Sequence, residues 1–157
     1  MALSKELDKV QKTIIHIHRE FFGESLSPMK LQKLCYYAQA FALAKGDLIF
    51  SEDFHAWTYG PVIRNLYFEY KDFGWRQITS EINLEDLLQV DSQEYNHIQE
   101  VVEAYGRFDG AALSTMTHRE DPWLLARGDI PEIAGSNAII SKQSIAEYFA
   151  AKIRENG

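Results

Sequence analysis

The sequence predicts a mainly helical α+β fold: a single compact domain, residues 1–157, around a central buried helix with a small β-hairpin beside it. Three observations support this prediction. Apolar residues recur at helical spacing along most of the chain, the stretch at about 28–45 is apolar on two opposite sides, and the stretch at about 48–59 favours β structure. No repeat or linker divides the 157 residues, which are enough to bury one core.

The first two helices have clear boundaries. One is expected from about Ser4 to Phe22, because its apolar residues form a single stripe and Gly23 follows. The second is the central helix: Ser27 suits its N-cap, Pro28 its first position, and Gly46 its end. Since two of its faces are apolar, we expect this helix to be buried all round.

The next segment predicts the hairpin. Leu48–Phe50 and Phe54–Tyr59 are the expected strands, with a turn at Ser51–Asp53. Gly60 and Pro61 are expected to stop the second strand and begin the next helix.

The second half of the chain predicts four more helices. Asp91 with Glu94 resembles a capping box at the start of a helix that runs to Tyr105. Further caps are expected for short helices and a final helix, at Asp109, Asp121 and Ser141.

The charge is concentrated in one segment. The chain has a net charge of -7, and residues 81–109 carry eight acids against Arg107 alone. Glu100 and Glu103 point away from the apolar stripe of their helix. This segment is either a solvated surface or an acidic docking surface for a basic partner, and the pattern leaves both open.

Composition excludes several classes of protein. The acidic balance and the lack of a basic face argue against nucleic acid as the main partner. A single cysteine, Cys35, excludes an internal disulfide, and no apolar run is long enough for a membrane span or a signal peptide. We therefore expect a cytoplasmic protein.

The candidate reactive residues do not form a recognisable catalytic set. His16 and His18 are two apart on a helix, so they point away from each other and cannot share a metal ion. His118 lies beside Glu120 and Asp121, which leaves a general base as one alternative, but a position at the end of a helix explains it better. We expect no catalytic residues, no cofactor and no metal.

Several segments in order resemble one family. MKLQKLCYYAQAFALAKG is followed by F-x-A-W-x-Y-G-P-V, by Leu66-Tyr67-x-x-Tyr70, and later by L-S-T-M-T-H-x-x-x-x-W. Together these are similar to the Panacea domain, the SocA-like antitoxin domain also known as phage-associated GepA-like. The resemblance extends from about Lys30 to Phe149.

This resemblance implies a bacterial or prophage antitoxin that is not an enzyme. Such a protein neutralises a toxin, usually encoded by the adjacent gene, by binding it directly or by delivering it to a protease. The alternatives are a small hydrolase or transferase that uses His118 with a nearby carboxylate, and a transcription regulator.

The partner-binding candidates combine aromatic and charged residues. Large rings are favoured at interface hot spots, but a structural role at the strand-to-helix corner explains Trp57, Tyr59 and Pro61 better. The oligomeric state is left open. The candidates are Trp57, Tyr59, Pro61, Phe68, Glu100, Glu103 and His118.

Overall fold

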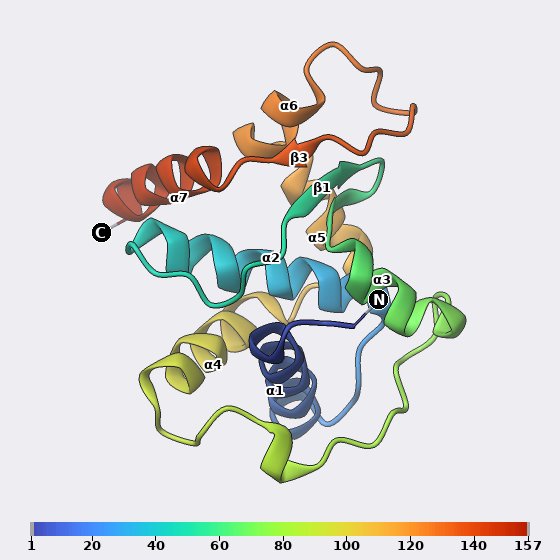
Figure 1. The fold of residues 1–157 in the computed structure, drawn as a ribbon, viewed down its shortest axis with the longest axis vertical. Helices are drawn as coiled ribbons and strands as arrows, with labels where there is room; N and C mark the ends of the chain where they lie inside the picture. Colours follow the sequence, from blue (N-terminus) through green and yellow to red (C-terminus); the bar gives the residue numbers. More distant parts are fainter. Residues whose placement is uncertain (1, 157) are drawn as a thin grey trace.

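Helix α2 (Pro28–Ala44) crosses the middle of the protein, as predicted. In the computed structural model, which describes residues 2–156, every residue from 31 to 40 is buried. Ser27 caps the helix by accepting a hydrogen bond from the Lys30 amide, and Pro28 fills the first turn. Figure 1 shows α1 (Lys5–Phe22) and α4 (Gln93–Tyr105) on one side of α2. Helices α7 (Lys142–Asn156) and α6 (Asp121–Arg127) lie on the other side with the sheet.

The remaining helices surround α2, so the predicted mainly helical α+β class is confirmed. Helices α1, α4, α5 and α7 all pack against α2. The caps of α5 at Asp109 and of α7 at Ser141 are those expected from the sequence, and Ser4 caps α1. Two short 3₁₀ turns follow α3 and precede α4. The bounds are α1 (Lys5–Phe22), α3 (Arg64–Tyr70), α4 (Gln93–Tyr105), α5 (Gly110–Thr117), α6 (Asp121–Arg127) and α7 (Lys142–Asn156).

A small antiparallel sheet contains the hairpin, but the hairpin lies later in the chain than predicted. Its strands are β1 (Phe54–Trp57) and β2 (Gly60–Val62), and β3 (Ile139–Ile140) pairs with the other edge of β1. The expected strand at 48–50 does not form. The backbone of this segment bonds to the side chain of Gln39 and not to a neighbouring strand. Gln39 accepts a hydrogen bond from the Ile49 amide and donates one to the Phe50 carbonyl.

Pro61 lies inside β2 and does not begin a helix, which corrects a second expectation. Since β2 is at the edge of the sheet, it tolerates a residue that cannot donate to a neighbouring strand. Helix α3 then begins three residues later, at Arg64.

Two of the expected helix caps are also wrong. Ser92, not Asp91, caps α4 by accepting from the Tyr95 amide, and Asp91 has a positive φ of 66°. Glu120 occupies the N-cap position of α6, so Asp121 lies in the first turn of that helix and does not cap it.

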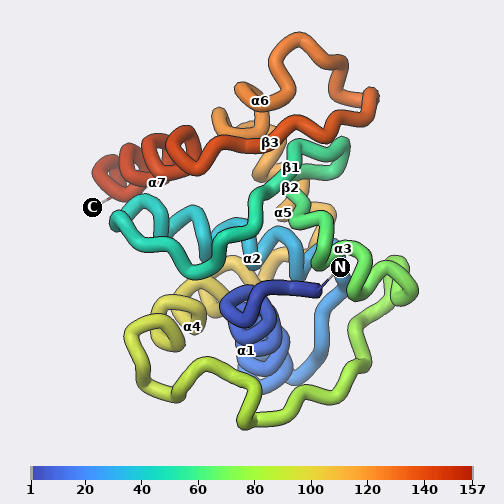
Figure 2. Tube along the Cα trace, viewed as in Figure 1, coloured from blue at the N-terminus to red at the C-terminus, as the bar shows by residue number. Residues whose placement is uncertain are grey.

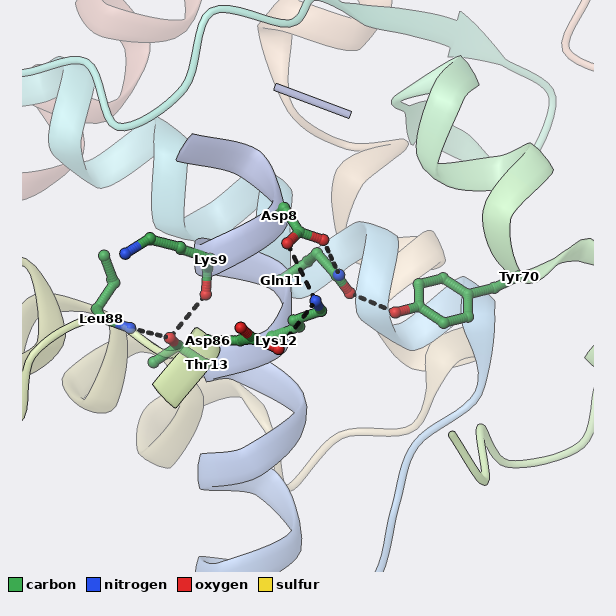
Figure 3. Close-up of polar contacts among 8 residues, drawn as sticks. All are labelled: Asp8, Lys9, Gln11, Lys12, Thr13, Tyr70, Asp86 and Leu88. Carbon is green, nitrogen blue, oxygen red and sulfur yellow. Dashed lines mark hydrogen bonds and ion pairs between the residues drawn. The ribbon is translucent and has the colours of Figure 1, made fainter. Parts of the chain in front are cut away.

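The long connection between α3 and α4 passes beside α1 (Figure 2), and polar side chains from the middle of that helix hold it. Figure 3 shows these contacts. The Leu88 amide donates to Thr13, the Lys12 ammonium lies 3.6 Å from Asp86, and the Tyr70 hydroxyl donates to Gln11 at 2.7 Å. Helix α1 therefore fixes both α3 and the connection that follows it.

Candidate functional site

A cavity of about 700 Å³ opens between the start of α2, the β1–β2 turn, α3 and the segment before β3. We call it the aromatic groove, because Trp57, Tyr59, Tyr67 and Tyr70 line it. Its deeper wall is apolar and includes Leu31, which is fully buried. Hollows of this volume and apolar character are typical of binding sites.

The outer rim of the aromatic groove exposes large rings to solvent. Tyr59 is 67% exposed and Tyr67 is 41% exposed. Trp57 meets Tyr67 edge to face, with ring centroids 5.1 Å apart, and its indole N–H donates to Asn137 at 2.9 Å. Trp57 is therefore held in place from both walls, while Tyr59 projects freely at the turn.

Lys33 lies buried at the inner end of the aromatic groove, a position that sequence reasoning missed. Its Nζ donates to the Pro61 carbonyl at 3.3 Å, and desolvation lowers its pKa to about 7. Gly60 makes this contact possible. Its φ of +114° favours glycine, and a Cβ at this position would lie only 2.7 Å from Lys33 Cε. The signal was present, since Lys33 lies on a helix apolar on two sides.

The structure brings some of the predicted partner-binding residues together. Trp57 and Tyr59 line the aromatic groove, and buried Pro61 lies behind it as the acceptor for Lys33. Phe68 is 51% exposed next to Tyr67, with the Lys71 ammonium 5.5 Å from its ring centroid. Phe68 therefore extends the exposed aromatic surface beyond the rim.

His118 lies at the end of α5, as the helix-end interpretation predicted, and contacts a lining residue of the aromatic groove without lining the groove itself. Its Nδ1 lies 2.5 Å from the Ser114 carbonyl and its Nε2 lies 2.6 Å from the Thr58 carbonyl. The ring also packs on Trp123, which is a core residue. Because both nitrogens face backbone carbonyls, the ring is bound as a structural link between α5 and the β1–β2 turn.

Glu100 and Glu103 form a different surface. Both are exposed on α4, and α4 and α3 lie on opposite sides of α1 in Figure 2. Glu100 also borders a smaller hollow of about 390 Å³ between α4 and the end of α2. The predicted candidates therefore belong to two separate surfaces, one aromatic and one acidic.

Glu120 is a second buried ionisable residue that the sequence did not reveal. Its Oε2 accepts from the Tyr37 hydroxyl at 2.9 Å and lies 3.9 Å from the Lys152 ammonium. Burial raises its pKa to about 7, against the weaker opposing effects of Tyr37 and Lys152. No hydrogen bond joins Glu120 to His118, because both ring nitrogens of His118 face backbone carbonyls.

Arg127 is buried without a carboxylate partner within residues 2–156. It donates to the Ala56 carbonyl of β1 and to the Pro131 carbonyl, both at 2.8 Å, and its guanidinium lies 4.8 Å from the Trp123 ring centroid. These bonds tie the segment before β3 to the sheet. The same segment supplies Asn137 to the aromatic groove.

The histidines and the cysteine near the core have structural surroundings. His18 is buried with its Nδ1 2.8 Å from the Glu24 carbonyl, and desolvation lowers its pKa. Burial raises the pKa of the Cys35 thiol. Over residues 2–156, no three His, Cys, Asp or Glu side chains gather as metal ligands would. In the same range, each helix is too short or too polar to span a membrane.

One family model matches the chain. It describes the antitoxin SocA-like Panacea domain and covers residues 31–124, which is more than half of the chain. The chain belongs to the SocA-like Panacea-domain antitoxin family. The matched residues include most of α2, the hairpin, α3, α4 and α5, and so most of the aromatic groove. No curated protein and no solved structure matches the chain in these comparisons.

Proposed function

We propose that this protein neutralises a partner toxin by binding it directly, without chemistry, and that the aromatic groove is the main docking site. The observation that carries this proposal is the exposed aromatic rim within the segment that defines an antitoxin family. Exposed tyrosines and tryptophans are favoured at interface hot spots, because a large rigid ring is buried at a small entropic cost.

The acidic surface of α4 is proposed as a second contact or as a steering surface. Glu100 and Glu103 are exposed, and the segment around them carries most of the net charge. A toxin with a basic surface would be attracted to this side before it docks. The toxin is expected to be encoded by the adjacent gene, and we place the complex in the cytoplasm.

Residues outside the matched segment are proposed to belong to the same functional domain, residues 1–157. Helices α1 and α7 both pack on α2, and α1 holds α3 through Gln11 and Tyr70. Delivery of the bound toxin to a protease is an additional outcome that the same docking would serve.

Binding and rescue with substituted groove residues test this proposal. Tyr59→Ala and Tyr67→Ala remove exposed rings, and each is expected to weaken toxin binding by on the order of 2 kcal/mol, as hot-spot truncations do. Phe21→Ala is the matched control, since Phe21 is 55% exposed on α1 and does not line the groove. The measurements are calorimetric affinity for the protein encoded by the adjacent gene and growth rescue on co-expression.

The results separate the possibilities. Loss of both affinity and rescue in the tyrosine variants, with the control unaffected, supports the aromatic groove as the docking site. Rescue by all three variants at the wild-type level would remove the groove from the account, and a wild-type protein that neither binds nor rescues would remove the antitoxin proposal.

A further inference from the structure

The charged residues that line the aromatic groove are all positive. They are Lys33 at its inner end and Lys71 at its exposed mouth, and no aspartate or glutamate within residues 2–156 lines it. This is the reverse of the whole chain, which has 23 acidic residues against 16 lysines and arginines. The aromatic groove is thus a positively charged site on an acidic protein.

Neither lysine has a carboxylate partner among residues 2–156. Lys71 contacts the ring of Phe68, and no carboxylate within residues 2–156 lies within ion-pair distance of its ammonium. Lys33 uses one of its three N–H groups, toward the Pro61 carbonyl. An amine buried with a single partner pays a desolvation cost that a nearby anion would offset.

Two neutral polar side chains of the groove already have partners. Gln32 donates to the Ile63 carbonyl and accepts from the Ile63 amide, and Asn137 accepts from the Trp57 indole. The donors left for an occupant include the neutral hydroxyls of Tyr59 and Tyr67, and the charged ones are the two lysines. The rest of the lining is dominated by apolar and aromatic surface, which binds apolar groups.

We propose that the aromatic groove binds an apolar segment of the toxin that carries a carboxylate side chain, with Lys71 and Lys33 as its positive partners. This inference rests on the proposed function, because it takes the toxin as the occupant. It adds the chemistry of the bound segment: aromatic or aliphatic residues for the rings of the rim, and an aspartate or glutamate for the lysines. The basic toxin surface expected to face α4 is a different part of the same partner.

Charge substitutions at the mouth of the groove test the inference. Lys71→Glu is expected to weaken calorimetric affinity for the protein encoded by the adjacent gene at least about tenfold, and Lys71→Gln by about threefold. Lys9→Glu makes the same charge change at an exposed position of α1, where Figure 3 shows its side chain pointing away from Tyr70, and is expected to leave affinity unchanged.

Synthetic peptides identify the segment. Overlapping peptides that cover the adjacent gene's product are tested for binding to the full chain, and the peptide that binds is expected to be apolar with an acidic residue. Changing its Asp or Glu to the amide should reduce binding as Lys71→Gln does, and changing it to lysine should restore binding to Lys71→Glu. That rescue is specific to a direct charge pair.

Each outcome decides something different. If the wild-type chain binds the toxin but Lys71→Glu binds equally well, this inference fails while the antitoxin proposal stands. A bound peptide without an acidic residue would also overturn it. So would an NMR titration in which phenylbutyrate, a small aromatic carboxylate, shifts the resonances of groove residues while the toxin does not. If the wild-type chain does not bind the toxin, both proposals fail.

Discussion

Two ionisable side chains, Lys33 and Glu120, are buried in the protein with few partners, and their pKa values are both displaced to about 7. As pH rises, Glu120 keeps its proton to a higher pH in the folded chain than in the unfolded one. Lys33 loses its proton at a lower pH in the folded chain than in the unfolded one. The first therefore weakens folding as pH rises toward 7, and the second weakens folding as pH falls toward 7. These two residues alone predict lowest stability near neutral pH.

Glu120→Gln is expected to remove the acidic half of this profile. Between about pH 4.5 and 7 the folded state holds a proton on Glu120 that the unfolded state releases, so stability falls by up to about 1.4 kcal/mol per pH unit. The glutamine keeps a polar group for Tyr37 and cannot ionise. Urea unfolding across this range should show a flatter profile for the variant, and an unchanged slope would contradict the assignment to Glu120.

Lys33→Met is expected to remove the alkaline half. Between about pH 7 and 10 the unfolded chain binds a proton on Lys33 that the folded chain does not, so wild-type stability rises with pH by up to about 1.4 kcal/mol per unit. Methionine fits the same space and has no amine to desolvate. The variant should unfold at higher urea concentration at pH 7, and equal midpoints there would show that the amine is well compensated.

At the scale of elements, local signals in the sequence were sufficient where the structure uses local contacts. Ser27 and Asp109 cap helices through amides three residues away, so their spacing alone predicts them. The hairpin lies later than predicted because the backbone of Ile49 and Phe50 bonds to the side chain of Gln39, which lies on α2. No local pattern contains that contact.

The candidate site followed the same rule. Trp57 and Tyr59 were predicted as candidates from residue type, and they line the aromatic groove. The wall made by Asn137 was not predictable, because it is brought from the far end of the chain by Arg127 and β3.

Arg127→Ala is expected to loosen that wall. Removing the guanidinium leaves the Ala56 carbonyl without this donor and frees the segment around Pro131, at a cost of roughly 2–3 kcal/mol. Hydrogen exchange should become faster in residues 129–138 while α2 remains protected. Equal exchange rates in that segment would show that other contacts hold it.

On the scale of the whole molecule, the acidic surface of α4 is expected to raise the rate at which the protein associates with the toxin. Reversing charge at Glu100 and Glu103 to lysine is expected to slow association with the toxin at low salt, with little change at high salt, because exposed charges steer over distances that salt screens. The same reversals at exposed Glu20 and Glu147, on α1 and α7, are the control. Stopped-flow rates that are equal for both pairs would remove the steering role.

The most direct test of the central claim is hydrogen exchange of the chain, free and in complex with the protein encoded by the adjacent gene. The account predicts protection on binding at residues 57–59 and 64–71, where the hairpin turn and α3 border the aromatic groove. Protection confined to other surfaces, with these two segments exchanging as in the free chain, would contradict it.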